Sequence, residues 1–137
     1  LEALAWCHIG EGTAVCAMDA RRGQVYWAAF DLATHTRLTP DAATPAEEAV
    51  AYAQTCKKPV IYIGDGAALC YNKDEQALPC PPALQVARAV GAGLAGHAMW
   101  HNGQCVAPAL LMPNYLRLSQ AERERAEREA TAEHATR

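Results

Sequence analysis

The residue types best suited to metal chemistry are His97, His101 and Cys105, which follow one another at intervals of four. On a helix, that interval can place two imidazoles on one metal ion, and a thiolate can add a third ligand. Gly103 interrupts the helical spacing before Cys105, however, and no acidic partner stands beside these residues. Two imidazoles alone do not close a tetrahedral shell, so we expect no specific metal site.

A second candidate is the turn Gly64-Asp65-Gly66, which directly follows the apolar run 59–63. Such a turn after a strand can approach a ligand through its backbone. It lacks the spaced glycines and the lysine of a phosphate-binding loop. We therefore favour the alternative of a tight turn in which Asp65 caps the next helix, and keep the three residues as ligand-contact candidates.

The polar loop 19–24 offers Asp19, Arg21 and Gly23 as further ligand-contact candidates. The alternative is an ion pair within the loop, worth less than about 1 kcal/mol. Cys16 fails as a nucleophile because no histidine stands near it in a recognisable pattern. The six cysteines contain no C-x-x-C pair, which is typical of reduced thiols in a cytosolic protein. No catalytic set and no cofactor site follows from these residues.

Two apolar runs, 13–18 and 25–30, must position the loop between them. Both are apolar on both faces, so we predict two strands buried from both sides and joined as an antiparallel hairpin. Gly23 suits a positive φ in the turn. The run 59–63 predicts a further buried strand, parallel to one hairpin strand because a helix separates them.

The remaining elements follow from periodicity and from capping residues. Thr44 and Glu47 predict a capping box at the start of a helix that Lys57, Lys58 and Pro59 end. Its expected apolar stripe is Ala46, Ala49, Val50 and Ala53. We expect a helix in 1–9, a short edge strand at 35–38, a helical turn at 67–71 and a long buried helix over 83–100.

The predicted helix over 83–100 carries a strip of small residues at Ala87, Gly91 and Ala95. Its three interior glycines, Gly91, Gly93 and Gly96, each cost about 1 kcal/mol of helix propensity, which suggests a packing requirement. A homodimer through this strip is one interpretation.

Length and charge restrict the class of protein. A chain of 137 residues forms one domain at most, and its net charge of −3 argues against a strong nucleic-acid surface. We expect no signal peptide, no membrane span and a cytoplasmic protein.

Two separated segments resemble one family. MDARRGQVYWAAF (18–30) is similar to the hairpin of the TsaB (YeaZ) family, with its Asp-Ala-Arg turn, Gly and Val-Tyr-Trp-Ala. PNYLRLS (113–119) is similar to the P-x-Tyr-Leu-Arg segment near the C-terminus of that family. Two matches in the right order are more specific than either alone.

The resemblance implies an α/β fold, namely an RNase-H-like lobe of the actin-like and sugar-kinase-like ATPase superfamily, with a small mixed sheet flanked by helices. The family has an N-terminal lobe with an Asp-Thr-Ser/Ala motif, which this chain lacks. We therefore expect 1–118 to be the C-terminal lobe and 119–137 to be a charged helical or disordered tail. The chain opens in mid-pattern, as a fragment would.

The resemblance also implies a function without catalysis. TsaB is a scaffold or activator for TsaD, which transfers threonylcarbamoyl to an adenosine of tRNA, with TsaE as the ATPase. We expect TsaD-like and TsaE-like partners, bound through the full-length parent of this chain, with no cofactor, no strong direct nucleic-acid binding and no membrane contact. The alternative is a nucleotide-binding or glycoprotease-like peptidase domain.

Overall fold

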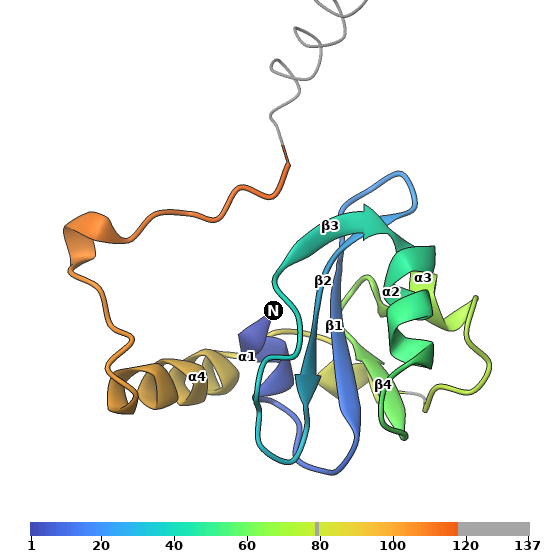
Figure 1. The fold of residues 1–137 in the computed structure, drawn as a ribbon, viewed down its shortest axis with the longest axis horizontal. Coiled ribbons are helices and arrows are strands. Elements are labelled where there is room, and N and C mark those ends of the chain that lie inside the picture. The colour runs from blue at the N-terminus through green and yellow to red at the C-terminus, as the bar shows by residue number, and fades with distance from the viewer. Residues whose placement is uncertain (79, 118–137) are drawn as a thin grey trace, which may run out of the picture.

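The computed structural model describes residues 1–78 and 80–117, which form a mixed four-stranded sheet with helices on both faces (Figure 1). Strands β1 (Thr13–Asp19) and β2 (Gln24–Asp31) pair antiparallel as a hairpin. Strand β3 (Ala42–Pro45) lies antiparallel to β2, and β4 (Val60–Ile63) lies parallel to β1. The strand order is β3-β2-β1-β4. The predicted hairpin and the predicted parallel strand are confirmed.

Both faces of the hairpin are buried, as the apolar pattern predicts. Helices α2 (Ala46–Gln54) and α3 (Ala67–Tyr71) cover one face, and the short helix α1 (Glu2–Ala5) covers the other (Figure 1). The strand side chains divide between two core clusters, with Val15, Ala17, Val25, Trp27 and Ala29 in one and Ala14, Cys16, Ala28 and Phe30 in the other. The alternation of side chains along each strand therefore determines which cluster a residue joins.

Helix α2 begins without the predicted capping box. Thr44 makes no cap to the helix, because its hydroxyl accepts a hydrogen bond of 3.0 Å from the indole Nε1 of Trp27. The apolar stripe was predicted correctly: Ala46, Ala49, Val50 and Ala53 are buried. The helix ends at Gln54, so the two lysines that follow lie outside it.

The third strand lies later in the chain than predicted. Residues 35–38 form one isolated bridge, Phe30 to Arg37, and the edge strand is β3. The carboxylate of Asp31 accepts hydrogen bonds from the amides of Ala33 and Thr34, which turns the chain directly after β2. After this turn, the chain pairs continuously with β2 only from Ala42, where β3 begins.

The long helix is shorter and more exposed than predicted. A single 3₁₀ turn, Pro82–Leu84, comes first, and helix α4 spans Ala89–His101. Only Gly91 and Ala95 are buried within α4, where it packs against α1. A Cβ at Gly91 would overlap the carbonyl oxygen of Ala3, whereas Gly93 and Gly96 have open space around them. One of the three glycines thus serves packing, and two residues of the small-residue strip, Gly91 and Ala95, lie where α4 packs against α1 of the same chain.

After α4 the chain runs through a short 3₁₀ turn, Pro108–Leu110, and returns toward the sheet (Figure 1). Its large apolar side chains are exposed here, including Leu110, Leu111, Met112 and Tyr115. The predicted charged tail, 119–137, lies outside the described residues. None of the helices in the part that the structure describes is long and apolar enough to cross a bilayer.

Candidate functional site

The turn after β4 and the end of β1 lie against each other. The Asp65 carboxylate accepts a hydrogen bond of 3.1 Å from the backbone N–H of Asp19, and the N–H of Gly66 donates to the carbonyl of Ala17 at 3.0 Å. The structure thus brings Asp19 and the 64–66 turn together. Asp65 does not cap α3, contrary to the alternative favoured from the sequence, because its carboxylate holds the end of the neighbouring strand.

The two glycines of this turn are required by close backbone packing. Gly64 has a φ of 115°, and a Cβ on it would overlap the carbonyl oxygen of Ala17. A Cβ on Gly66 would lie 2.8 Å from the backbone carbon of Met18. Since β1 already occupies the space beside both glycines, their lack of a side chain is explained without a ligand.

The hairpin turn carries the other sequence-predicted contact residues. The Asp19 carboxylate accepts a hydrogen bond of 2.6 Å from the N–H of Arg21, and it lies 3.6 Å from the Arg21 guanidinium. The Arg21 side chain is 87% exposed, so this ion pair contributes little to stability. Gly23 has the positive φ expected of it, 72°. Asp19, Arg21 and Gly23 therefore form a polar, largely exposed end of the sheet.

A third segment reaches this end of the sheet. The Arg117 guanidinium donates a hydrogen bond of 2.6 Å to the carbonyl oxygen of Ala20, in the hairpin turn. The Asn114 amide donates to the Asp41 carboxylate at 3.4 Å, beside the edge of the sheet. Between the 64–66 turn and the 3₁₀ region lies a small, mainly apolar cavity of about 130 Å³, lined by Leu4, Met18, Gly64, Asp65, Gln85, Val86 and Ala87.

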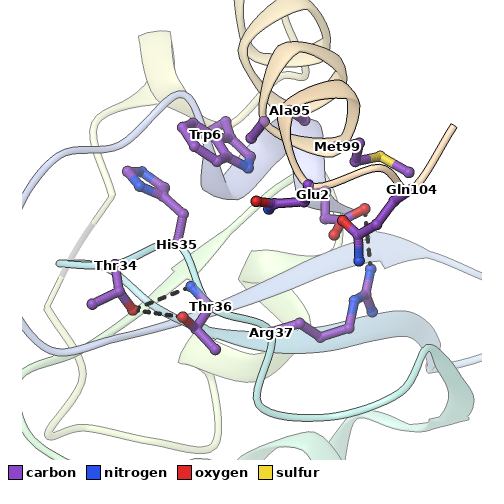
Figure 2. A pocket seen from close by; sticks show the side chains of 11 residues that line it. Glu2, Trp6, Thr34, His35, Thr36, Arg37, Ala95, Met99 and Gln104 are labelled. Atoms are coloured by element: carbon purple, nitrogen blue, oxygen red, sulfur yellow. Dashed lines mark hydrogen bonds and ion pairs between the residues drawn. The ribbon is translucent and has the colours of Figure 1, made fainter.

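A larger pocket lies at the opposite end of the hairpin, where Thr13 pairs with Asp31. It has a volume of about 350 Å³ and is lined by α1, the 34–37 loop and the C-terminal half of α4. Figure 2 shows Trp6 and His35 facing it from one side, and Met99, Gln104 and Arg37 from the other. The rings of Trp6 and His35 stack, with centroids 4.2 Å apart and planes within 9°.

Ion pairs organise the polar side of this pocket. The Arg37 guanidinium lies 2.6 Å from the Asp41 carboxylate and 3.6 Å from that of Glu2. Nearby, hydrogen bonds from Thr34 lower the pKa of Asp31. The pocket offers donors, acceptors and an aromatic wall, which suits a small polar molecule or a polar side chain. Sequence reasoning missed it, because its residues come from three distant segments with no shared motif.

One cysteine and one histidine lie close enough to raise the question of nucleophilic chemistry. The Cys80 thiol is 3.6 Å from Nε2 of His8. Burial raises the pKa of the Cys80 thiol and lowers the pKa of His8, so both groups favour their neutral forms. A reactive cysteine needs the thiolate, so this contact between a buried thiol and a half-buried imidazole serves packing. Within residues 1–78 and 80–117, no three His, Cys, Asp or Glu side chains form a group that could hold a metal.

Comparisons with known proteins find similarity at the level of structure. No family profile matches the sequence, and no curated protein matches it. One solved structure, YeaZ from Pseudomonas aeruginosa, superposes with a TM-score of 0.64 and 21% sequence identity. The match covers 85% of this chain and 55% of that chain. A second, described as an uncharacterized Pseudomonas aeruginosa protein with similarity to the peptidase YeaZ, gives a TM-score of 0.61 at 21% identity, covering 85% of this chain and 56% of that one.

These matches bear on the fold. The α/β architecture with a small mixed sheet between helices is shared with both structures, and the chain spans little more than half of their length. The resemblance predicted from two short segments is thus confirmed for the fold: over most of its length, this chain is similar in structure to part of YeaZ.

Proposed function

We propose that this chain acts without catalysis, as part of a scaffold or activator in the cytoplasmic machinery that forms N6-threonylcarbamoyladenosine in tRNA. In this proposal it is the C-terminal, RNase-H-like lobe of a TsaB-type protein, and its partners are a TsaD-like transferase and a TsaE-like ATPase. The observation that carries the proposal is the hydrogen bond of 2.6 Å between Arg117 and the Ala20 carbonyl.

That contact supports the proposal because both of its residues belong to the segments that resemble the TsaB family. The two segments are far apart in the chain, and the resemblance of each lies in its local sequence alone. Arg117 and Ala20 are separated by 97 positions, yet they meet at one end of the sheet. If the likeness of the two short segments were due to chance, there would be no reason for them to meet in the folded chain.

The test is a binding and activity measurement with the TsaD-like protein of the same organism. We expect the chain to form a complex with that protein in light scattering after gel filtration, or to increase the rate at which it modifies tRNA. The variant Arg117→Ala should weaken either effect, because it frees the segment that this bond holds against the hairpin turn; one charged hydrogen bond limits the loss to about tenfold. Arg22→Ala, which removes an exposed guanidinium from the same turn, is the matched control and should behave as the parent.

The same sample separates this proposal from a nucleotide-binding or peptidase domain. A ligand that binds the native state raises the melting temperature by mass action. We expect no rise with millimolar ATP, and no hydrolysis of ATP or peptide by the chain alone. The scaffold proposal would be overturned if the chain had no effect on the TsaD-like protein and, in addition, either its melting temperature rose clearly with ATP or it hydrolysed ATP or peptide alone.

A further inference from the structure

We propose that His97 and His101 form a two-imidazole binding site for a divalent transition-metal ion of the Cu²⁺, Ni²⁺ and Zn²⁺ group. Both residues lie in the C-terminal part of α4, and both are exposed. Their Nε2 atoms converge to 3.1 Å, and their ring centroids lie 4.4 Å apart. The site is independent of the proposed scaffold function, because it uses neither the hairpin turn nor Arg117.

The separation of the two nitrogen atoms is the distance that one metal ion requires. Metal–imidazole bonds measure about 2.0–2.1 Å, so an ion bound to both Nε2 atoms at 3.1 Å would subtend an N–metal–N angle of about 95–102°. This angle lies between the right angle of square-planar or octahedral coordination and the tetrahedral angle. The two side chains could therefore chelate an ion with little movement.

In the metal-free chain, the same two atoms share one hydrogen bond, in which one Nε2–H donates to the lone pair of the other. Metal binding requires a lone pair on both Nε2 atoms, so the shared proton must leave Nε2. It can do so without changing the charge of the imidazole, because the neutral ring can carry its proton on Nδ1 instead.

Helix α4, which carries His97 and His101, is fixed in place by its packing against α1. Gly91 and Ala95 pack α4 against α1, and a Cβ at Gly91 would overlap the Ala3 carbonyl oxygen. His97 and His101 follow at helical spacing on another face, in line with the exposed side chains of Val90 and Leu94. His101 is the last residue of α4, where the partial negative charge of the helix terminus favours a cation.

The site is open. Two imidazoles fill two of the four or more positions of these ions, and water would fill the others. It differs from a closed metal site, which needs at least three protein ligands. Affinity at an imidazole pair should follow the general order for divalent ions, with Cu²⁺ bound more tightly than Ni²⁺ or Zn²⁺.

The fluorescence of Trp100 can report binding of the ion, because its ring lies beside both histidines. Its ring centroid lies 4.8 Å from that of His101 and 6.2 Å from that of His97. Titration of the full chain with Ni²⁺, which does not oxidise thiols, should quench tryptophan fluorescence with a saturating curve and a stoichiometry of one ion per chain. Trp100→Phe should remove most of this quenching, while calorimetry still detects the ion.

Three variants test which side chains hold the ion. His97→Ala and His101→Ala should each weaken Ni²⁺ binding by at least about tenfold, because one imidazole loses the effective concentration that the second provides. Alanine favours helix more than histidine does, so both variants should keep the helical circular dichroism of the parent. Cys105→Ser is the matched control and should bind as the parent does. Unchanged binding in either histidine variant, or loss of binding in Cys105→Ser, would overturn the two-imidazole site.

Discussion

The guanidinium of Arg117 and the backbone carbonyl of Ala20 are joined by a hydrogen bond of 2.6 Å, across 97 positions of sequence. This bond fixes the end of a long exposed segment to the turn of the β1–β2 hairpin. Between α4 and Arg117, that segment contacts solvent through large apolar side chains, among them Leu110, Leu111 and Tyr115. The position of the segment therefore depends on a few polar contacts near its end.

The first prediction concerns that contact. Arg117→Ala should release the segment from the hairpin turn with little change in the midpoint of global unfolding, since the residue lies outside both core clusters. A lost hydrogen bond from a charged donor is worth about 1.5 kcal/mol, so local opening should become roughly tenfold more frequent. Chymotrypsin cleavage after Tyr115, followed by mass spectrometry, measures the change. Arg22→Ala should be cleaved at the parental rate, and equal rates for both variants would contradict the prediction.

The second prediction separates two glycines of one helix. Gly91→Ala should destabilise the chain by about 2 kcal/mol or more, because the new methyl group would overlap the Ala3 carbonyl and force α4 away from α1. Gly93→Ala adds the same methyl group where nothing lies within 4 Å, so it should stabilise the helix by up to about 1 kcal/mol. Urea unfolding followed by circular dichroism gives both values. Shifts of the same sign and size would contradict the packing of α4 on α1.

The third prediction concerns a buried polar pair on β4. The Tyr62 hydroxyl donates a hydrogen bond of 2.8 Å to the carboxylate of Asp74, which is only 5% exposed. Tyr62→Phe should lower the free energy of unfolding by about 2–3 kcal/mol, because a buried carboxylate loses its donor. Tyr26→Phe, at a half-buried position on β2, is the control, and should change the free energy by less than about 0.5 kcal/mol. A similar cost in both variants would contradict a specific role for the Tyr62–Asp74 bond.

The fourth prediction is a loss of stability in alkali that depends on Cys16. Burial raises the pKa of this thiol from 9.0 to about 12. Below pH 9 the thiol is protonated in both states, whereas between about pH 9 and pH 12 the unfolded chain loses the proton that the native chain keeps. Stability should therefore fall as pH rises through this range, by up to about 1.4 kcal/mol per pH unit from this group.

Comparison of slopes isolates that contribution from those of other groups. The free energy of unfolding of Cys16→Ala, measured from about pH 8 to about pH 11, should fall less steeply than that of the parent, although the variant starts lower because it has lost a buried side chain. Cys105 is exposed, so Cys105→Ser should keep the parental slope. If Cys16→Ala also kept the parental slope, Cys16 would not be the group responsible.

Local sequence was sufficient to predict the elements that an apolar pattern alone defines. The continuous apolar runs of β1 and β2 predicted that both faces are buried, because side chains of a strand must point in alternate directions wherever the strand lies. The stripe of α2 and the apolar run of β4 were recognised in the same way. Two short segments also predicted the fold that this chain shares with part of YeaZ, since turn chemistry and residue order are properties of the chain itself.

The choice of partner for a side chain was decided only by the tertiary structure. Thr44 and Asp65 both stand where a cap is expected, yet one accepts the Trp27 indole N–H and the other the Asp19 amide. Gly91 and Gly93 look alike in sequence, and only one meets a neighbouring backbone. The sequence around a residue specifies which donors, acceptors and side-chain atoms that residue offers. The groups that it contacts come from distant segments, so only the folded chain decides which of them it meets.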